Sequence, residues 1–310
     1  MSNNNASAAS FRCLACLAVM FACVFMTLCA SGQESDDLAT FALEVRSVIE
    51  SQRIPGGIAV TLGYDSAQPA LLIADEGAFL VQALTLESGA VDSMRTEIRE
   101  ADRCETVSAD LLLGEGKLPY AENMINLLVV HQDLFGDRGP ISLEEIDRVM
   151  APGGVVCHLF PIMQSRSDLD ALIRIISLSG EQPLIAETLT AVDEFGPGDF
   201  LITVKLRPDE IDDWSHYRHG PDGNPVAQDT VVAPPVHLQW KDGPLNLRSH
   251  ETDSSFSAAV VANGRFYSIV DEAALSTPGQ EGLPDKWSLI ARDAFNGVEL
   301  WRIPISAWGW

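Results

Sequence analysis

Basic side chains are scarce in this sequence. Its 310 residues contain 20 Lys and Arg against 44 Asp and Glu, which gives a formal net charge of −24 at pH 7. Proteins that bind nucleic acid neutralise phosphates with clustered Lys and Arg. The charge therefore argues against nucleic acid as a partner, and equally against binding to an anionic membrane surface.

Cysteine is scarce outside the amino terminus, and four of the six cysteines lie before residue 30. There, Arg12 precedes an apolar run over residues 14–29, which ends in small residues. This order is typical of a secretory signal peptide, which we assign to residues 1–31. The run is short for a membrane span of about 20 residues, so a cleaved signal is favoured over an uncleaved anchor. We expect an exported protein in the periplasm or cell envelope, without a stable membrane span.

Several catalytic and metal-binding motifs are also missing. The sequence contains no Walker loop, no HExxH, no zinc-finger spacing and no Ser-His-Asp elbow. Only Cys104 and Cys157 remain after the signal segment, and they are far apart. Export permits a disulfide, but two small buried thiols are the favoured interpretation. We therefore assign no catalytic residue and no metal.

The middle of the chain alternates between strand-like and helix-like segments. A leading helix is expected over residues 36–50, within a segment 32–55. After it, apolar strands are predicted over 58–62, 79–84, 106–109, 125–130, 155–160, 184–190 and 199–205, and helices over 68–74, 90–101, 143–150 and 168–178. Such alternation predicts an α/β fold, a doubly wound and mostly parallel sheet with an antiparallel edge.

Three segments of this region carry a family resemblance. They are Thr61-Leu-Gly-Tyr-Asp-Ser-Ala67, the stretch from Leu118-Pro-Tyr to Val129, and Arg148-Val-Met-Ala-Pro-Gly-Gly-Val155. Residues 56–206 resemble a class I S-adenosylmethionine-dependent methyltransferase, a Rossmann-like domain. The resemblance implies S-adenosylmethionine as the cofactor.

The first of these motifs departs from the family pattern. That pattern is an acid followed by three glycines, spaced acid-x-Gly-x-Gly-x-Gly, which allows the backbone to approach the cofactor. The corresponding residues here are Thr61, Gly63, Asp65 and Ala67, so one glycine of three is present. The resemblance places Thr61, Gly63 and Asp65 in the cofactor site.

Two further cofactor positions follow from the resemblance. Thr85 occupies the place of the acid that binds the ribose, with Glu87 two residues later, and Asp110 occupies the place of the adenine contact. His131 and Asp133 follow the fourth strand on the substrate side. Two hypotheses remain open: an active methyltransferase with an altered pocket, or a domain that kept the fold and lost the cofactor.

A polar linker over residues 207–235 follows, and it includes His216 and His219. These two histidines could share a helical face as metal ligands, but a role in fixing the linker is favoured, because no third ligand is apparent. Beyond the linker, short β-runs cover residues 236–310, and Asn-Gly pairs at 263–264 and 296–297 predict hairpin turns, because both residue types tolerate positive φ.

The last β-runs resemble one repeat of a pyrroloquinoline-quinone (PQQ)-type β-propeller. The matching residues are Ala291, Asp293, Ala294, Gly297 and Trp301. We therefore expect an all-β propeller blade after the Rossmann-like domain, completed by further blades. No PQQ or calcium site can be assigned.

Two tryptophans of this region, Trp240 and Trp301, are expected to dock blades by burial rather than to stack on a ligand.

The leading hypothesis is an exported binding or scaffold protein with a PQQ-like propeller repeat and a degenerate methyltransferase-like domain. Its expected partners are other propeller blades or envelope proteins. The alternatives are an S-adenosylmethionine-dependent methyltransferase and the amino-terminal part of a PQQ-dependent dehydrogenase.

Overall fold

The computed structural model describes residues 41–114, 116–131, 141–160, 184–187, 199–230, 238–243, 255–273 and 285–305. The predicted signal peptide, the predicted helix over 168–178 and Asp133 lie outside these ranges. The chain divides into two units, Met1–Val45 and Arg46–Trp310. Residues 41–51 are helical. Among the described helices, none combines the length and the apolar character that a membrane crossing requires.

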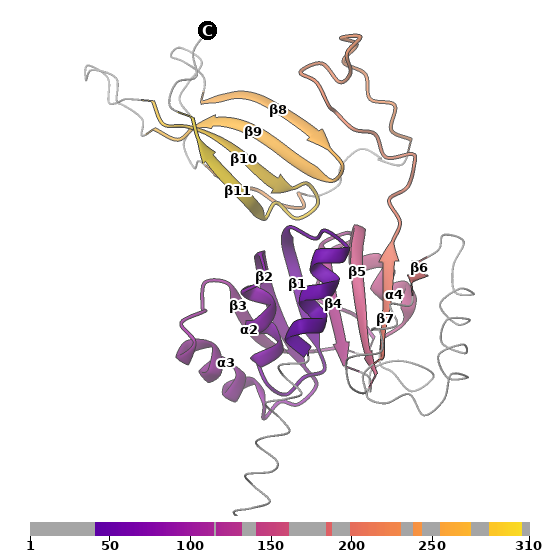
Figure 1. Ribbon diagram of the computed structural model, residues 1–310, viewed down its shortest axis with the longest axis vertical. Helices are drawn as coiled ribbons and strands as arrows, with labels where there is room; N and C mark the ends of the chain where they lie inside the picture. The colour runs from indigo at the N-terminus through magenta and orange to yellow at the C-terminus, as the bar shows by residue number, and fades with distance from the viewer. Residues whose placement is uncertain are drawn as a thin grey trace, which may run out of the picture. The chain divides into compact units, whose positions relative to one another are not determined.

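Seven strands form the first sheet, in the order β3-β2-β1-β4-β5-β7-β6 (Figure 1). Their bounds are β1 Gly56–Leu62, β2 Ala78–Thr85, β3 Val107–Leu111, β4 Ile125–His131, β5 Met150–Phe160, β6 Leu184–Glu187 and β7 Asp199–Lys205. The strands from β3 to β5 are parallel, whereas β7 runs antiparallel to both β5 and β6. The predicted mostly parallel sheet with an antiparallel edge is confirmed.

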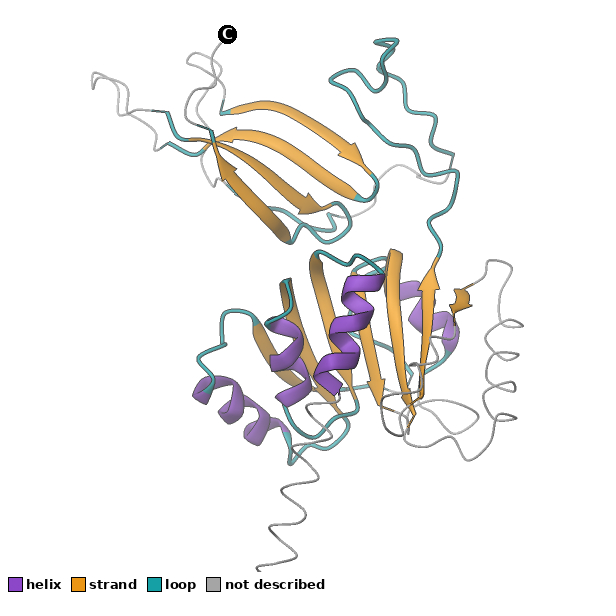
Figure 2. Cartoon of the chain, viewed as in Figure 1, coloured by secondary structure: helices purple, strands orange, loops and turns teal. Residues whose placement is uncertain are grey.

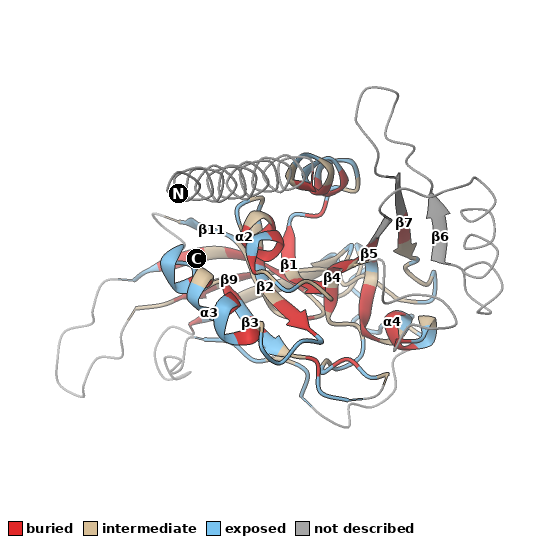
Figure 3. Cartoon of the chain, turned by 90° about the horizontal axis from the view of Figure 1, so that it is seen from below, coloured by how far each residue is buried: buried red, intermediate tan, exposed pale blue. Residues whose placement is uncertain are grey.

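Helices cover both faces of this sheet. They are α2 over Gln68–Ala74, α3 over Val91–Glu100 and α4 over Leu143–Val149, close to the predicted bounds. Helices α2 and α4 lie on opposite faces (Figures 1 and 3), as a doubly wound sheet requires. One apolar core lies on the α4 face of the sheet, where Val60 and Leu62 of β1 and Leu128 and Val130 of β4 are almost completely buried in one cluster with α4.

The start of α4 has one half of a capping box. Ser142 accepts a hydrogen bond from the Glu145 backbone N–H at 3.2 Å, as an N-cap does. The Glu145 carboxylate does not return to the backbone of Ser142. It accepts instead from the Leu118 N–H at 2.7 Å and pairs with Arg148 at 2.7 Å. The side chain thus ties α4 to the loop before β4.

A second sheet contains β8 over Phe256–Ala262, β9 over Arg265–Asp271, β10 over Trp287–Asp293 and β11 over Glu299–Pro304. Neighbouring strands are antiparallel and consecutive in the chain (Figure 2). A propeller blade is also a four-stranded antiparallel sheet. A single sheet of this kind does not establish a propeller, so the blade remains a prediction. Residues 238–240, predicted as part of a strand, form no strand.

The two Asn-Gly turns of this sheet differ in backbone geometry. Asn263 and Gly264 have φ values of 50° and 72°, as the predicted two-residue hairpin turn requires. At the second turn only Gly297 has a positive φ, 77°. The predicted hairpin turn is nevertheless present between β10 and β11. The Asn296 side-chain amide donates to the Met124 carbonyl at 2.8 Å and to Asn126 Oδ1 at 2.6 Å. A register shift after Ala291 accommodates this turn.

The two tryptophans have different environments. Trp240 donates its ring N–H to the Ala294 carbonyl at 3.0 Å and packs against Phe266, with ring centroids 6.1 Å apart. This contact agrees with the expected docking role. Trp301 is 39% exposed, because it lies on the edge strand β11, and it contacts only the ring of Tyr267 among the described aromatic pairs. Docking of Trp301 against a further blade therefore remains a prediction.

The linker histidines make separate hydrogen bonds. His219 Nε2 lies 2.6 Å from Asp212 Oδ2, and His216 Nδ1 lies 2.9 Å from the Ser215 hydroxyl. No group of three His, Cys, Asp or Glu side chains able to hold a metal occurs within the described ranges. The linker also contacts β8, where the Trp214 carbonyl accepts from the Val261 N–H at 2.8 Å.

Candidate cofactor-binding site

The carboxyl ends of β1 and β2 form the edge of the sheet where a cofactor is expected. Strand β1 lies between β2 and β4, so the order of the strands reverses there. Ligands of open α/β sheets bind outside the carboxyl ends of strands at such a switch point. Directly after β1, Gly63 has a φ of 84° and donates its N–H to the Leu84 carbonyl at 2.8 Å. At Gly63 the chain that leaves β1 therefore turns toward the carboxyl end of β2.

Asp65 and Thr85 are brought together at this edge. The Thr85 hydroxyl donates to Asp65 Oδ1 at 2.8 Å and accepts from the Glu87 N–H at 3.1 Å. Asp65 is exposed, and its Oδ2 has no hydrogen bond to another described residue. A carboxylate therefore lies beside the end of β2, although the strand itself ends in a threonine. The sequence signal for it is an aspartate at a glycine position of the first motif.

Thr61 does not join this pair. It lies inside β1, level with Ala83 and Val129, and is completely buried. Its hydroxyl has no hydrogen-bond partner among the described residues. A buried hydroxyl without a partner costs about 1–3 kcal/mol. The predicted role of Thr61 as a cofactor contact is thus not supported by its position, since no surface of the residue is accessible.

Asp110 is also separate from the pair. In the register of β2 and β3 it is level with Leu84, not with Thr85. Successive residues of a strand face opposite sides of the sheet, so Asp110 and Thr85 lie on different faces. The Asp110 carboxylate accepts from Arg95 Nη2 at 2.6 Å and from Gln82 Nε2 at 3.3 Å. It remains about half exposed.

The start of α2 is occupied by an anion from within the protein. The carboxylate of Glu97, in α3, accepts from the Ser66 hydroxyl and from the Ala67 N–H, both at 2.9 Å. The amino end of a helix attracts negative charge, and here a side chain supplies it. Consequently, the Ala67 N–H is not available to an anionic group of a ligand.

Beside β4, Tyr64 and His131 form an edge-to-face pair with ring centroids 5.2 Å apart. Burial raises the pKa of the Tyr64 phenol far above its usual range. Burial also raises the pKa of the nearby Cys157 thiol to about 12. Both groups are therefore neutral at physiological pH. His131, the predicted substrate-side residue, is the last residue of β4 and contacts the Tyr64 ring.

Comparisons with known proteins find similar solved structures but no matching family. No family model matches the chain, and no curated protein matches it. A solved structure from Methanococcus maripaludis, described provisionally as an S-adenosyl-L-methionine-dependent methyltransferase, is similar with a TM-score of 0.46 and 14% identity, over 56% of this chain and 88% of that one. A SAM-dependent methyltransferase from Aquifex aeolicus has a TM-score of 0.41 and 11% identity, over 52% and 88%.

A third similar structure is geranyl diphosphate C-methyltransferase from Streptomyces coelicolor A3(2), in complex with Mg²⁺, geranyl diphosphate and S-adenosyl-L-homocysteine. Its TM-score is 0.37 and its identity 13%, over 50% of this chain and 74% of that one. Identities this low concern the fold alone. The Rossmann-like fold of the first sheet follows from its own strand order and directions.

Proposed function

We propose that the Rossmann-like domain binds S-adenosylmethionine at the carboxyl ends of β1 and β2 and is a methyltransferase with an altered pocket. The observation that supports this most is the 2.8 Å hydrogen bond between the Thr85 hydroxyl and Asp65. It holds a carboxylate where a ribose-binding acid is needed. The cofactor would supply a methyl group bound to a positively charged sulfur, and no residue is assigned to the acceptor.

The chemistry of Asp65 fits a ribose. A carboxylate accepts several hydrogen bonds, and Thr85 uses only Oδ1 of Asp65, so Oδ2 is open to a diol. The hydroxyl of Thr85 already donates to Asp65, so Thr85 positions the carboxylate rather than binding the ribose itself. The net charge of −24 also favours a cationic sulfonium over an anionic ligand.

Calorimetric titration of S-adenosylmethionine into the protein tests this proposal. We expect a dissociation constant of roughly 1–100 µM. Asp65→Asn and Thr85→Val should each weaken binding by about tenfold, because both remove the positioned carboxylate or its support. Asp75→Asn is the matched control, since Asp75 follows the other end of α2 and pairs with Arg103. Absence of binding at millimolar ligand, in a folded sample, would refute the proposal.

A second candidate is an exported scaffold whose antiparallel sheet is a PQQ-type propeller blade. Two observations support it. Glu97 already occupies the start of α2. In addition, a polar cluster of Asn126, Asp293 and Asn296 joins the two sheets. Export rests on the signal peptide predicted for residues 1–31. Loss of the S-adenosylmethionine signal in the titration above, together with capture of envelope proteins that Asn126→Ala abolishes, would favour this candidate.

A further inference from the structure

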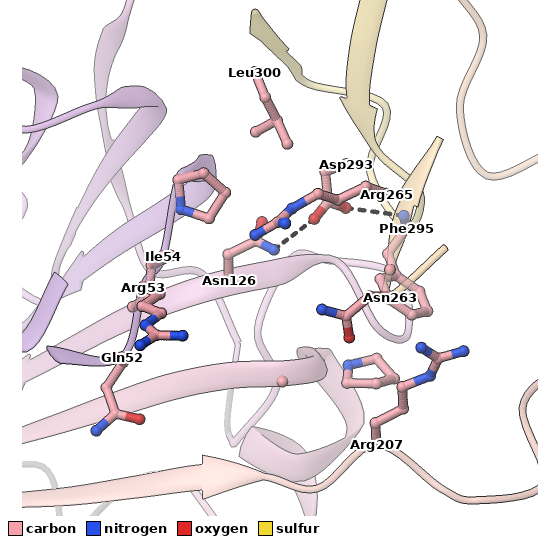
Figure 4. A pocket seen from close by; sticks show the side chains of 14 residues that line it. Gln52, Arg53, Ile54, Asn126, Arg207, Asn263, Arg265, Asp293, Phe295 and Leu300 are labelled. Carbon is pink, nitrogen blue, oxygen red and sulfur yellow. Dashed lines mark hydrogen bonds between the residues drawn. The ribbon is translucent and has the colours of Figure 1, made fainter. Parts of the chain in front are cut away.

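A cavity of about 390 Å³ lies at the opposite edge of the first sheet from the proposed cofactor site. Its walls come from the residues before β1, from the start of β4 and from the turns of the second sheet (Figure 4). Pockets of roughly 300–1,000 Å³ accept small organic ligands. This cavity is therefore large enough for a small molecule.

Three arginines line this cavity, in a chain with only 20 Lys and Arg against 44 Asp and Glu. They are Arg53, Arg207 and Arg265, and among the described residues that line the cavity the only acidic one is Asp293. The cavity is thus a local concentration of positive charge in a strongly acidic protein. Arginine presents a planar set of N–H donors that matches carboxylates and phosphates.

Two of these arginines make no ion pair with a residue that the structure describes. Arg207 pairs with Asp213 at 2.6 Å. The side chains of Arg53 and Arg265, in contrast, make no ion pair or hydrogen bond to another residue in the described part of the chain. The guanidinium N–H groups of both residues are therefore available to solvent or to a ligand.

Asp293 does not neutralise Arg265 by direct contact, although the two are near each other (Figure 4). Its carboxylate accepts from Asn126 Nδ2 at 2.8 Å and from the backbone N–H groups of Phe295 and Asn296 at 2.9 and 3.0 Å. These neutral donors satisfy the buried carboxylate. Arg265 is consequently left with unused donors.

The backbone of Arg53 is unusual for an arginine. It lies after the helix that ends at residue 51, with a φ of 54°, and the Ile54 N–H bonds back to the Ile49 carbonyl at 3.0 Å. Glycine usually takes this left-handed position after a helix, because a Cβ makes the conformation unfavourable for other residues. Strain at a residue that lines a cavity points to a role for its side chain.

We propose that this cavity binds a small oxyanion, a carboxylate or phosphate group, between the guanidinium groups of Arg53 and Arg265. Asn263, on the β8–β9 turn, is a further lining side chain with amide donors. The site is independent of the proposed methyltransferase function, because it involves different residues at the amino ends of the strands.

Calorimetric titration with inorganic phosphate and, separately, with succinate tests the site at low ionic strength, where screening is weak. We expect saturable binding of at least one probe, with a dissociation constant of about 0.1–1 mM. Arg53→Gln and Arg265→Gln should each weaken it by about tenfold or more. Arg99→Gln is the charge-matched control, since Arg99 bonds only within α3, and it should leave binding unchanged.

The probe that binds more tightly identifies the oxyanion. Absence of saturable binding for both probes would overturn the proposal, and so would equal weakening by Arg99→Gln, which indicates a general effect of charge. Circular dichroism checks that each variant folds. Arg53 is exposed and has no partner among the described residues, so Arg53→Gln decides the outcome even where Arg265→Gln disturbs the nearby turn.

Discussion

Asn126 in β4 donates from Nδ2 to Oδ2 of Asp293 at 2.8 Å, across 167 positions of the chain. The other end of its amide, Oδ1, accepts from the Ile58 N–H at 2.9 Å and from Asn296 Nδ2 at 2.6 Å. The register of β4 shifts at this residue against both β1 and β5. One polar side chain in an apolar strand therefore connects the start of the first sheet to a turn of the second.

Replacing this side chain removes the connection. Asn126→Ala should lower the free energy of unfolding by about 2–3 kcal/mol, because it leaves the Ile58 N–H and the Asp293 carboxylate short of a partner. Chemical denaturation measures the change. Asn224→Ala is the control, since Asn224 is exposed and its side chain bonds to no other described residue. Equal midpoints for Asn126→Ala and the parent protein would contradict the role of Asn126.

The packing of Trp240 against the β10–β11 turn gives a second prediction. A Cβ on Gly297 would lie 2.5 Å from the Trp240 ring, at a φ of 77°. Gly223 has a φ of 70° but open space around it. Gly223→Ala should thus cost only the backbone strain of about 1–2 kcal/mol. Gly297→Ala should cost about 1–3 kcal/mol more through the overlap, and it should change tryptophan fluorescence.

Both variants are compared by thermal unfolding. Equal losses of stability for Gly223→Ala and Gly297→Ala would show that Trp240 does not pack against this turn in solution.

Glu145 predicts a pH dependence of stability. The hydrogen bond from Arg148 is the largest influence on Glu145 and lowers the pKa of its carboxyl below the usual 4.5, against the opposing effect of burial. A lowered folded-state pKa stabilises the fold above the unfolded-state value, and that stabilisation disappears as the pH falls through the folded-state value. The parent protein should therefore exceed Glu145→Gln in stability at pH 6–7, and the difference should shrink below about pH 4.5.

Urea denaturation across this pH range measures the difference. Glu105→Gln is the control, since Glu105 is exposed in a turn, and its difference from the parent should stay near zero throughout. If the difference in free energy of unfolding between the parent protein and Glu145→Gln is the same at every pH, the ionised Glu145 carboxylate does not stabilise the fold.

The two described cysteines should differ in reactivity. Cys104 is exposed, whereas Cys157 is buried with a pKa raised to about 12. Because the thiolate is the reactive form, iodoacetamide at pH 8 should modify Cys104 and leave Cys157 unmodified until the protein unfolds. Peptide mass spectrometry distinguishes the two sites. Rapid modification of Cys157 in the native protein would contradict its burial in β5.

Much of the first sheet could be predicted from the sequence, because its signals are local. Apolar runs mark β1, β4 and β5, Pro69 marks the first turn of α2, and Ser142 marks the start of α4. The pair of Asp65 and Thr85 could not be predicted. It depends on the turn at Gly63 and on the register of β1 against β2, which bring together residues 20 positions apart.

In the second sheet, too, local features could be predicted from the sequence and long-range side-chain contacts could not. The hairpin turns at Asn263-Gly264 and Asn296-Gly297 have local signals and were predicted, but the bonds of the Asn296 side chain to Met124 and Asn126, 172 and 170 positions earlier, could not be predicted. Likewise, the exposure of Trp301 depends on its place in an edge strand. Local pattern identifies the strands, whereas long-range contacts decide which polar groups meet.

The most direct test of the central claim is hydrogen exchange with and without S-adenosylhomocysteine, which maps the bound region. When the ligand is present, backbone amides in residues 63–67 and 85–89 should exchange more slowly. The amides of the turn at residues 263–264 should exchange at an unchanged rate. Unchanged exchange at both segments under saturating ligand would contradict cofactor binding at the carboxyl ends of β1 and β2.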